Sequence, residues 1–211
     1  PALRDVTYEN AQARERTQVL MDIANDLGGM VIGTGDMSEL ALGWATYNGD
    51  HMSMYGVNAS VPKTLVRHLV RYYADTCEDQ ELRGVLLDIL DTPVSPELLP
   101  PKDGEIAQKT EDLVGPYELH DFFIWRTVVC GERRRAIRAV AKRAFKGVYS
   151  EGEIDRWLDV FCRRLVTQSF KRNCAPDGIK VFPAYFGPDD WHIPSDMKYE
   201  GDIVQPKKKR R

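Results

Sequence analysis

The order of elements in the first quarter of the chain restricts what it can fold into. Four apolar residues at helical spacing predict a helix over residues 7–27: Leu20, Ile23, Ala24 and Leu27. Two glycines end that pattern, and the short apolar run at 30–32 then stops at Gly33, which suits a buried strand. Asp36 or Ser38 can cap the helix that follows. Helix, strand, glycine turn and helix in succession predict a unit of a parallel α/β sheet.

Polar and charged side chains follow directly after this strand. Ligands of parallel sheets bind where strands end, so the side chains after Gly33 are expected at a ligand site. Gly33 and Gly35 let the backbone approach a ligand closely. Thr34 offers a hydroxyl, and Glu39 offers a carboxylate suited to Mg²⁺, which prefers oxygen ligands. A plain strand-to-helix turn in which Glu39 only caps the helix fits the pattern about equally well.

The remaining sequence indicates a mostly helical chain. Further helices are predicted from Pro62, over 80–90, from Pro116, over 131–146 and over 150–168. Residues 47–61 are expected to be irregular, and 91–115 to form a long loop of the kind that serves as a lid. One strand cannot form a sheet, so other strands must be hidden in weak segments or lie in sequence outside this chain. The Pro- and Gly-rich segment 173–211 is expected to wrap over the surface.

Three basic side chains in the first third are candidates for binding an anion. Lys63 stands in the first turn of a predicted helix, where the dipole disfavours a cation, so it is placed to reach a phosphate. A solvated lysine is the alternative. Arg14 and Arg16 could clamp a phosphate, or could form surface ion pairs with neighbouring glutamates.

Charge and composition exclude several classes of protein. The chain is 43% hydrophobic and 29% charged, as globular proteins are. The sequence contains no run of 18 apolar residues, the length that a membrane-spanning helix needs. Residues 1–100 carry 7 Lys and Arg against 15 Asp and Glu, whereas 101–211 carry 22 against 17, including the terminal KKKRR. An acidic body gives no general nucleic-acid footprint. The four cysteines lack zinc-site spacing, which indicates buried, reduced thiols in a cytoplasmic protein.

Long motifs carry a resemblance to a known family. The segment GTGDMSELALGWATYNGDHMSMYG, followed by VNASVPKTLVRHLV, resembles NAD⁺ synthetases. The similarity begins at YENAQARERTQVLM and continues through LLPPKDGEIAQKTEDLVGPYELHDFF to QSFKRNCAPDGIKVFPAYFGPDDWHIPSD. It is greatest to the long, glutamine-dependent bacterial form and extends to residue 196. The chain therefore resembles the C-terminal portion of the synthetase domain of that form.

The resemblance implies a fold and a reaction. The fold would be an adenine-nucleotide α-hydrolase-like α/β domain with a parallel sheet, over residues 1–172, with a C-terminal extension and flexible basic tail over 173–211. The reaction would be ATP-dependent amidation of deamido-NAD⁺ to NAD⁺ through an adenylate, with Mg²⁺. Ammonia would come from glutamine hydrolysed in an upstream glutaminase domain. A cytoplasmic homo-oligomer without membrane or nucleic-acid partners would carry it out.

The resemblance also assigns individual residues, none of them catalytic. The positions that match ATP-binding residues are Thr34, Lys63, Arg14 and Ser95. The positions that match deamido-NAD⁺-binding residues are Asn10, Glu39, Trp44, Ala45, Thr46, Tyr47, Asp50, Lys171 and Arg172. Glu39 also matches the Mg²⁺ ligand.

One family motif does not occur in these 211 residues. The pyrophosphate loop S-G-G-x-D-S is absent, as are the glutaminase nucleophile and its partners. We therefore expect this chain to need the upstream half of the synthetase domain and the glutaminase domain, and to be inactive alone. Two alternatives stay open. One is a related ATP-pyrophosphatase-type amidotransferase such as a GMP synthetase, and the other is a non-catalytic nucleic-acid-binding module that uses KKKRR.

Overall fold

The structure is a computed structural model that describes residues 5–95, 110–187, 190–191 and 193–201. Its elements in chain order are α1 (Val6–Asp26), β1 (Ile32–Asp36), α2 (Met37–Leu42), β2 (Tyr55–Asn58), α3 (Lys63–Thr76), α4 (Gln80–Asp91), α5 (Thr110–Val114), α6 (Tyr117–Ile124), the π-helical turn η1 (Trp125–Val129), α7 (Arg134–Ala144), α8 (Glu151–Thr167) and the 3₁₀ segment η2 (Ser169–Cys174). The predicted fold class, an α/β domain that is mostly helical in this chain, is confirmed.

The sheet has two parallel strands within the described residues. β1 pairs with β2 in the register Ile32 with Tyr55, and the ladder is irregular between Gly33 and Asp36. α2 lies in the connection between the two strands, as a parallel pair requires. The segment after η2 returns to this sheet, because the backbone N–H of Gly56 donates to the carbonyl of Asp177 at 2.7 Å. The predicted strand–helix unit is therefore present.

Two boundaries in this region were predicted wrongly. The glycines after the apolar run belong to β1, whereas the sequence predicted a turn there. Gly33 fits the strand because its missing side chain makes room for Ser53, whose Oγ would lie 2.3 Å from a β-carbon on Gly33. Part of the segment predicted to be irregular is β2, a strand of four residues that includes Gly56 and so carries little strand signal.

The core lies between α2, α6, α7 and α8. α8 begins with a capping box between Ser150 and Glu153. Its buried residues recur every three or four positions, as expected for one face of a helix. Phe161 of α8 packs on Phe123 of α6, with ring centroids 5.7 Å apart, and Phe186 joins the same cluster from the C-terminal segment. This core holds the C-terminal end of α2 firmly in place.

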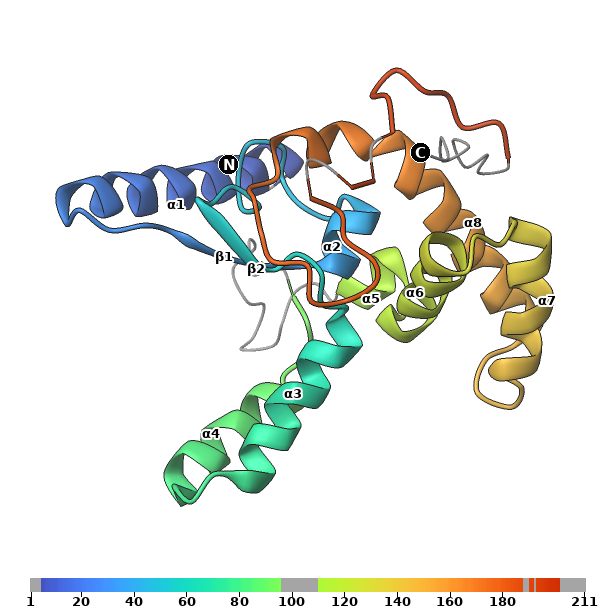
Figure 1. Cartoon of the computed structure of the whole chain (residues 1–211), viewed down its shortest axis with the longest axis horizontal. Helices are drawn as coiled ribbons and strands as arrows, with labels where there is room; N and C mark the ends of the chain where they lie inside the picture. The colour runs from blue at the N-terminus through green and yellow to red at the C-terminus, as the bar shows by residue number, and fades with distance from the viewer. Residues whose placement is uncertain (1–4, 96–109, 188–189, 192, 202–211) are drawn as a thin grey trace.

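Two parts of the chain extend away from this core in Figure 1. α1 reaches outward beside β1, and α3 and α4 form a hairpin that projects from the body. The predicted apolar stripe on α1 is mostly exposed, since only Ala24 of its four residues is buried. No helix in the described part of the chain is long and apolar enough to cross a membrane.

The predicted loop and the cysteines need partial correction. Residues 110–114 of the predicted loop form α5, and the backbone N–H of Thr110 donates to the carbonyl of Val94, near the start of the same predicted loop. The stretch 96–109 and the KKKRR tail lie outside the described residues. All four cysteines are free, as predicted, but only Cys162 is fully buried and Cys130 is exposed.

Candidate nucleotide site

The junction between β1 and α2 is built by reciprocal capping. Asp36 is the N-cap of α2, and its carboxylate accepts a hydrogen bond from the backbone N–H of Glu39 at 3.0 Å. The Glu39 carboxylate accepts one from the backbone N–H of Asp36 at 3.3 Å. Both the predicted cap at Asp36 and the capping alternative for Glu39 are therefore present. The capping box fixes the Glu39 carboxylate beside the end of β1.

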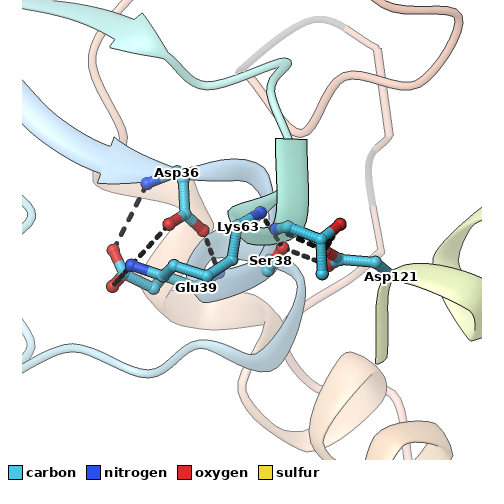
Figure 2. A network of polar contacts seen from close by, with 6 residues as sticks. Asp36, Ser38, Glu39, Lys63 and Asp121 are labelled. Carbon is cyan, nitrogen blue, oxygen red and sulfur yellow. Dashed lines mark hydrogen bonds and ion pairs between the residues drawn. The ribbon is translucent and has the colours of Figure 1, made fainter. Parts of the chain in front are cut away.

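Lys63 joins these two carboxylates from the start of α3. Its Nζ atom lies 2.6 Å from Oδ2 of Asp36 and 2.7 Å from Oε1 of Glu39 (Figure 2). Burial and the neighbouring Glu39 raise the pKa of Asp36 from 3.8 to about 7, although Lys63 opposes the shift. At Lys63, burial alone would lower the pKa, but the two carboxylates outweigh it and raise the pKa. Both shifts favour keeping protons within this cluster.

A second buried network holds the start of α3 in place. The carboxylate of Asp121 on α6 accepts hydrogen bonds from the hydroxyl of Ser38 and from the backbone and hydroxyl of Thr64 (Figure 2). The Oγ of Ser38 in turn accepts from the backbone N–H of Lys63 at 2.8 Å. α2, α3 and α6 therefore meet at polar contacts on either side of Lys63.

Sequence reasoning missed Asp121 as a site residue. Its signal was weak: a carboxylate between the aromatic residues of an apolar helix, where a charge is unusual unless it is paired. A second signal was the proline that begins α3, since Pro62 makes no side-chain cap for that helix. The cap comes instead from Asp121, 57 residues further along the chain than Thr64.

A cavity of about 400 Å³ opens beside this junction, between α1, β1, the loop after α2, residues 94–95 and η2. Eight of the residues predicted for the site line it: Thr34, Glu39, Trp44, Ala45, Asp50, Ser95, Lys171 and Arg172. Arg16, the less favoured of the two α1 arginines, also lines it. Segments from the beginning and the end of the chain thus meet at one pocket, whose size is within the range of small-molecule sites.

Two cations from η2 line one wall of this pocket. Lys171 donates from Nζ to the carbonyl oxygens of Gly43, at 3.0 Å, and Ala45, at 2.6 Å. Burial, together with Arg164, lowers the pKa of Lys171. The guanidinium of Arg172 also donates to backbone carbonyls, and burial lowers its pKa to about 10. Among the described residues neither cation forms an ion pair with a carboxylate, although Asp50, which lines the same pocket, attracts Lys171.

The five other predicted residues lie outside the pocket lining: Asn10, Arg14, Thr46, Tyr47 and Lys63. All of them except Lys63 form hydrogen bonds between α1 and the loop after α2, next to the pocket. The hydroxyl of Thr46 donates to Asn10 at 2.9 Å, and its backbone N–H donates to Asp50 at 2.7 Å. Arg14 donates from Nε to the carbonyl of Tyr47 at 3.3 Å. These bonds attach the loop after α2 to α1.

His51 is a lining residue that sequence reasoning did not single out. Its Nδ1 lies 3.0 Å from the carbonyl of Thr46, which can only accept, so Nδ1 carries the proton. Nε2 lies 3.0 Å from Sγ of Cys174, whose thiol also lies within donating distance, 3.2 Å, of the carbonyl of Lys171. Burial lowers the pKa of His51 and raises that of Cys174. Both shifts favour the neutral forms of His51 and Cys174. In the sequence, the only indication of this contact was a histidine in a polar loop.

Comparison with known proteins assigns the family. A model of the NAD synthase family matches residues 1–121. Glutamine-dependent NAD(+) synthetase of Mycobacterium tuberculosis is 44% identical, over 92% of this chain and 31% of the relative. The protein of that name from Mycobacterium leprae is 42% identical, over 92% of this chain and 32% of the relative.

A solved structure shows the same fold. The crystal structure of a glutamine-dependent NAD(+) synthetase from Cytophaga hutchinsonii superposes with a TM-score of 0.68 at 20% identity, over 90% of this chain and 28% of that chain. The present chain spans about a third of the length of the curated relatives that it matches. Both the match over most of the chain and the identity above 40% place it in one family. The chain belongs to the NAD synthase family.

Proposed function

We propose that this chain forms part of the synthetase site of a glutamine-dependent NAD⁺ synthetase. The carboxylate oxygen of deamido-NAD⁺ attacks the α-phosphorus of ATP, and the bond to pyrophosphate breaks. Ammonia then attacks the carboxyl carbon of the adenylate, loses a proton and expels AMP, which gives the amide. The observation that carries this proposal is that two cations, Lys171 and Arg172, line the same pocket as Thr34 and Glu39 at the end of β1.

The pocket offers the groups that an anionic dinucleotide requires. Lys171 and Arg172 offset the negative charge of the substrate, because among the described residues they donate to carbonyl oxygens and form no ion pair with a carboxylate. Trp44 gives a flat apolar wall for a ring, and the hydroxyls of Thr34 and Ser95 lie on the same pocket for ATP. We assign the remaining predicted residues, Asn10, Arg14, Thr46, Tyr47, Asp50 and Lys63, to holding or extending these surfaces.

A magnesium ion fits this site through Glu39. Among the described residues no group of three or more His, Cys, Asp or Glu side chains could hold a metal. Mg²⁺ is commonly bound by one or two carboxylates together with substrate phosphates and water, so Glu39, which lines the pocket, suffices as the protein ligand, whereas the buried Asp36 does not line it. When bound, the ion would neutralise charge that develops on the phosphates. The protein's own contribution is to hold the Glu39 carboxylate fixed through the capping box.

The complete reaction requires segments outside these 211 residues. The curated relatives are about three times as long, and the S-G-G-x-D-S pattern of the family does not occur here. We infer that the pyrophosphate loop and the ammonia source belong to those segments. We also propose that the whole protein is a cytoplasmic homo-oligomer.

Two assays test this function. The native gene product that carries this chain is expected to convert deamido-NAD⁺ to NAD⁺ with ATP and glutamine or ammonia, whereas the 211-residue chain alone is expected to show no turnover. Amidation of a purine nucleotide in place of deamido-NAD⁺ would overturn the proposal in favour of the related amidotransferase.

A charge variant tests the pocket wall. Lys171→Met in the native gene product is expected to raise the KM for deamido-NAD⁺ about 10-fold or more, as loss of a charged hydrogen-bonding group does. The matched control is Lys180→Met, because Lys180 is an exposed lysine after the end of η2, does not line the pocket and pairs with Asp190. An equal KM in the two variants would contradict the assignment of Lys171.

The nucleic-acid alternative is not favoured. It rests on residues 207–211, which lie outside the described part of the chain. The helix α7 is also rich in basic residues, but several of them pair with α8: Arg134 with Asp159, and Arg138 with Asp155. Cations already paired with carboxylates add little to the attraction of a phosphate backbone.

A further inference from the structure

The C-terminal end of α2 is held by three cationic side chains that reach it from α8 and η2. Arg164, Lys171 and Arg172 all donate hydrogen bonds to backbone carbonyls of this short segment. The carbonyls that accept are those of Leu40, Ala41, Leu42, Gly43 and Ala45. Cations are favoured at a helix C-terminus, where the last carbonyls lack intrahelical partners. The turn that follows α2 is therefore fixed by residues more than 120 positions away.

Arg164 differs from the other two cations in what it touches. Lys171 and Arg172 line the pocket, whereas Arg164 does not. Arg172 lies over the ring of Phe186, which is not a lining residue of the pocket. The Nε of Arg164 donates to the carbonyl of Leu42 at 2.9 Å, and its Nη2 donates to that of Gly43 at 3.3 Å. Its guanidinium carbon lies 5.3 Å from the centre of the ring of Trp44. A planar fork fixed by two carbonyls thus lies against one face of the indole.

The backbone turn that carries Trp44 is held in place by its neighbours. Gly43 has φ +54°, and a β-carbon on it would lie 2.5 Å from Cβ of Gln168 at the end of α8. The turn therefore packs directly on α8, and the next residue is Trp44. The backbone N–H of Trp44 also donates to the carbonyl of Glu39 at 2.9 Å. With the turn fixed, the remaining freedom of Trp44 is the rotation of its side chain.

We propose that Arg164 is a positioning residue that fixes the indole of Trp44 as a preformed wall of the nucleotide pocket. This inference rests on the proposed function, because it assigns Trp44 to the dinucleotide substrate. A ring that is already ordered loses less conformational entropy when a ligand binds against it. Loss of Arg164 should therefore weaken substrate binding while leaving the groups at the ATP side of the pocket, Thr34 and Ser95, as they are.

Steady-state kinetics on the native gene product form the first arm of the test. Arg164→Gln is expected to raise the KM for deamido-NAD⁺ about 3- to 30-fold, the range that corresponds to a cation–π contact. The KM for ATP and kcat are expected to change less than about 2-fold. Arg164→Lys keeps the charge but not the planar fork, so we expect it to resemble the Gln variant.

The chain offers a matched control for this arm. Arg156 makes the same kind of contact with Trp157, at 4.4 Å from its guanidinium carbon to the ring centre, away from the pocket. Arg156→Gln is expected to leave both KM values unchanged. Equal effects of Arg156→Gln and Arg164→Gln, or a rise in the KM for ATP as large as that for deamido-NAD⁺, would overturn the proposal.

A spectroscopic arm separates failure of this inference from failure of the proposed function. The protein is labelled with 5-fluorotryptophan, and the ¹⁹F signal of Trp44 is assigned by its loss in Trp44→Phe. Arg164→Gln should shift or broaden that signal, whereas Arg156→Gln should affect only the signal of Trp157. An unchanged Trp44 signal in Arg164→Gln and Arg164→Lys overturns the inference. A wild type that neither binds nor converts deamido-NAD⁺ overturns the proposed function, while the ¹⁹F result still decides what Arg164 does to Trp44.

Discussion

Asp121 caps a helix to which it does not belong. Its Oδ2 accepts hydrogen bonds from the backbone N–H of Thr64 at 2.9 Å and from the Thr64 hydroxyl at 2.7 Å. α3 begins after Pro62, which has no side-chain acceptor to offer. The negative charge of a buried carboxylate at this end of α3 suits the helix dipole. Lys63 is thereby held at its position beside Asp36 and Glu39.

Asp121→Asn is expected to destabilise the fold by about 1–3 kcal/mol, because the amide accepts fewer hydrogen bonds than the carboxylate and leaves buried donors unpaired. The measurement is urea unfolding of the 211-residue chain. Asp79→Asn is the matched control, since Asp79 is the exposed N-cap of α4. Asn caps a helix as well as Asp does, so this change is expected to cost less than about 0.5 kcal/mol. Equal losses in the two variants would contradict the role of Asp121.

His120 makes the stability of the chain depend on pH. The side chain is fully buried, its Nε2 donates to the carbonyl of Val114 at 2.6 Å, and Nδ1 has no hydrogen-bond partner among the residues that the structure describes. Burial lowers its pKa from 6.5 to about 4. The unfolded chain therefore takes up a proton at a higher pH than the folded one. The stability contributed by neutral His120 is complete above the unfolded pKa and is lost as the pH falls from 6.5 towards 4.

This linkage predicts a loss of about 2 kcal/mol between about pH 7.5 and about pH 5 from His120 alone. The free energy of unfolding is measured in urea across this range for the wild type and for His120→Gln. Gln does not titrate, so the difference between the two proteins should shrink by that amount as the pH falls. Two curves that stay parallel would show that His120 is not the group responsible.

Local features of this fold could be predicted from sequence, and the reason is visible at α2. The N-cap Asp36 and its partner Glu39 are three residues apart, so the capping box follows from the sequence alone. The start of α3 and both bounds of α4 were close to those predicted because both helices carry clear helical periodicity. The long motifs of the site likewise placed Trp44 and Lys171 on one pocket.

Features that depend on distant contacts could not be predicted. β2 is a strand because it pairs with β1 and with the segment near Gly178, and its own composition gives little sign of this. The contact between Arg164 and Leu42 joins positions 122 residues apart. No local pattern in the sequence indicates such a partner, so the contact of Arg164 with the turn after α2 could not be predicted and is known from the structure.

Gly43 is required by its conformation and by the packing of α8 against it. Gly43→Ala is expected to destabilise the chain by about 1–3 kcal/mol, because alanine is strained at φ +54° and its β-carbon would clash with Gln168. Gly84→Ala is the control, since Gly84 lies inside α4 with open space around it. That change should stabilise by up to about 1 kcal/mol. Urea midpoints that move in the same direction for both variants would contradict this assignment.

The pairing of Lys63 with Asp36 predicts a strong coupling between the two side chains. At a pH above the Asp36 pKa of about 7, Lys63→Met leaves the Asp36 carboxylate, whose side chain is 2% exposed, without its cation, and is expected to cost about 3–5 kcal/mol. Asp36→Asn removes the charge but keeps the cap, since Asn can still accept from the backbone N–H of Glu39. It is expected to cost less, about 1–3 kcal/mol.

The double variant decides whether these costs arise from one interaction. When Asp36→Asn is present, Lys63→Met no longer leaves a buried charge without its partner at position 36. The loss of unfolding free energy in the double variant is therefore expected to be smaller than the sum of the two single losses. Urea unfolding of the four proteins gives the coupling free energy, expected at about 1–3 kcal/mol. Additive losses would mean that Lys63 and Asp36 stabilise the chain independently. Glu39 alone would then be the partner that holds Lys63 at the end of β1.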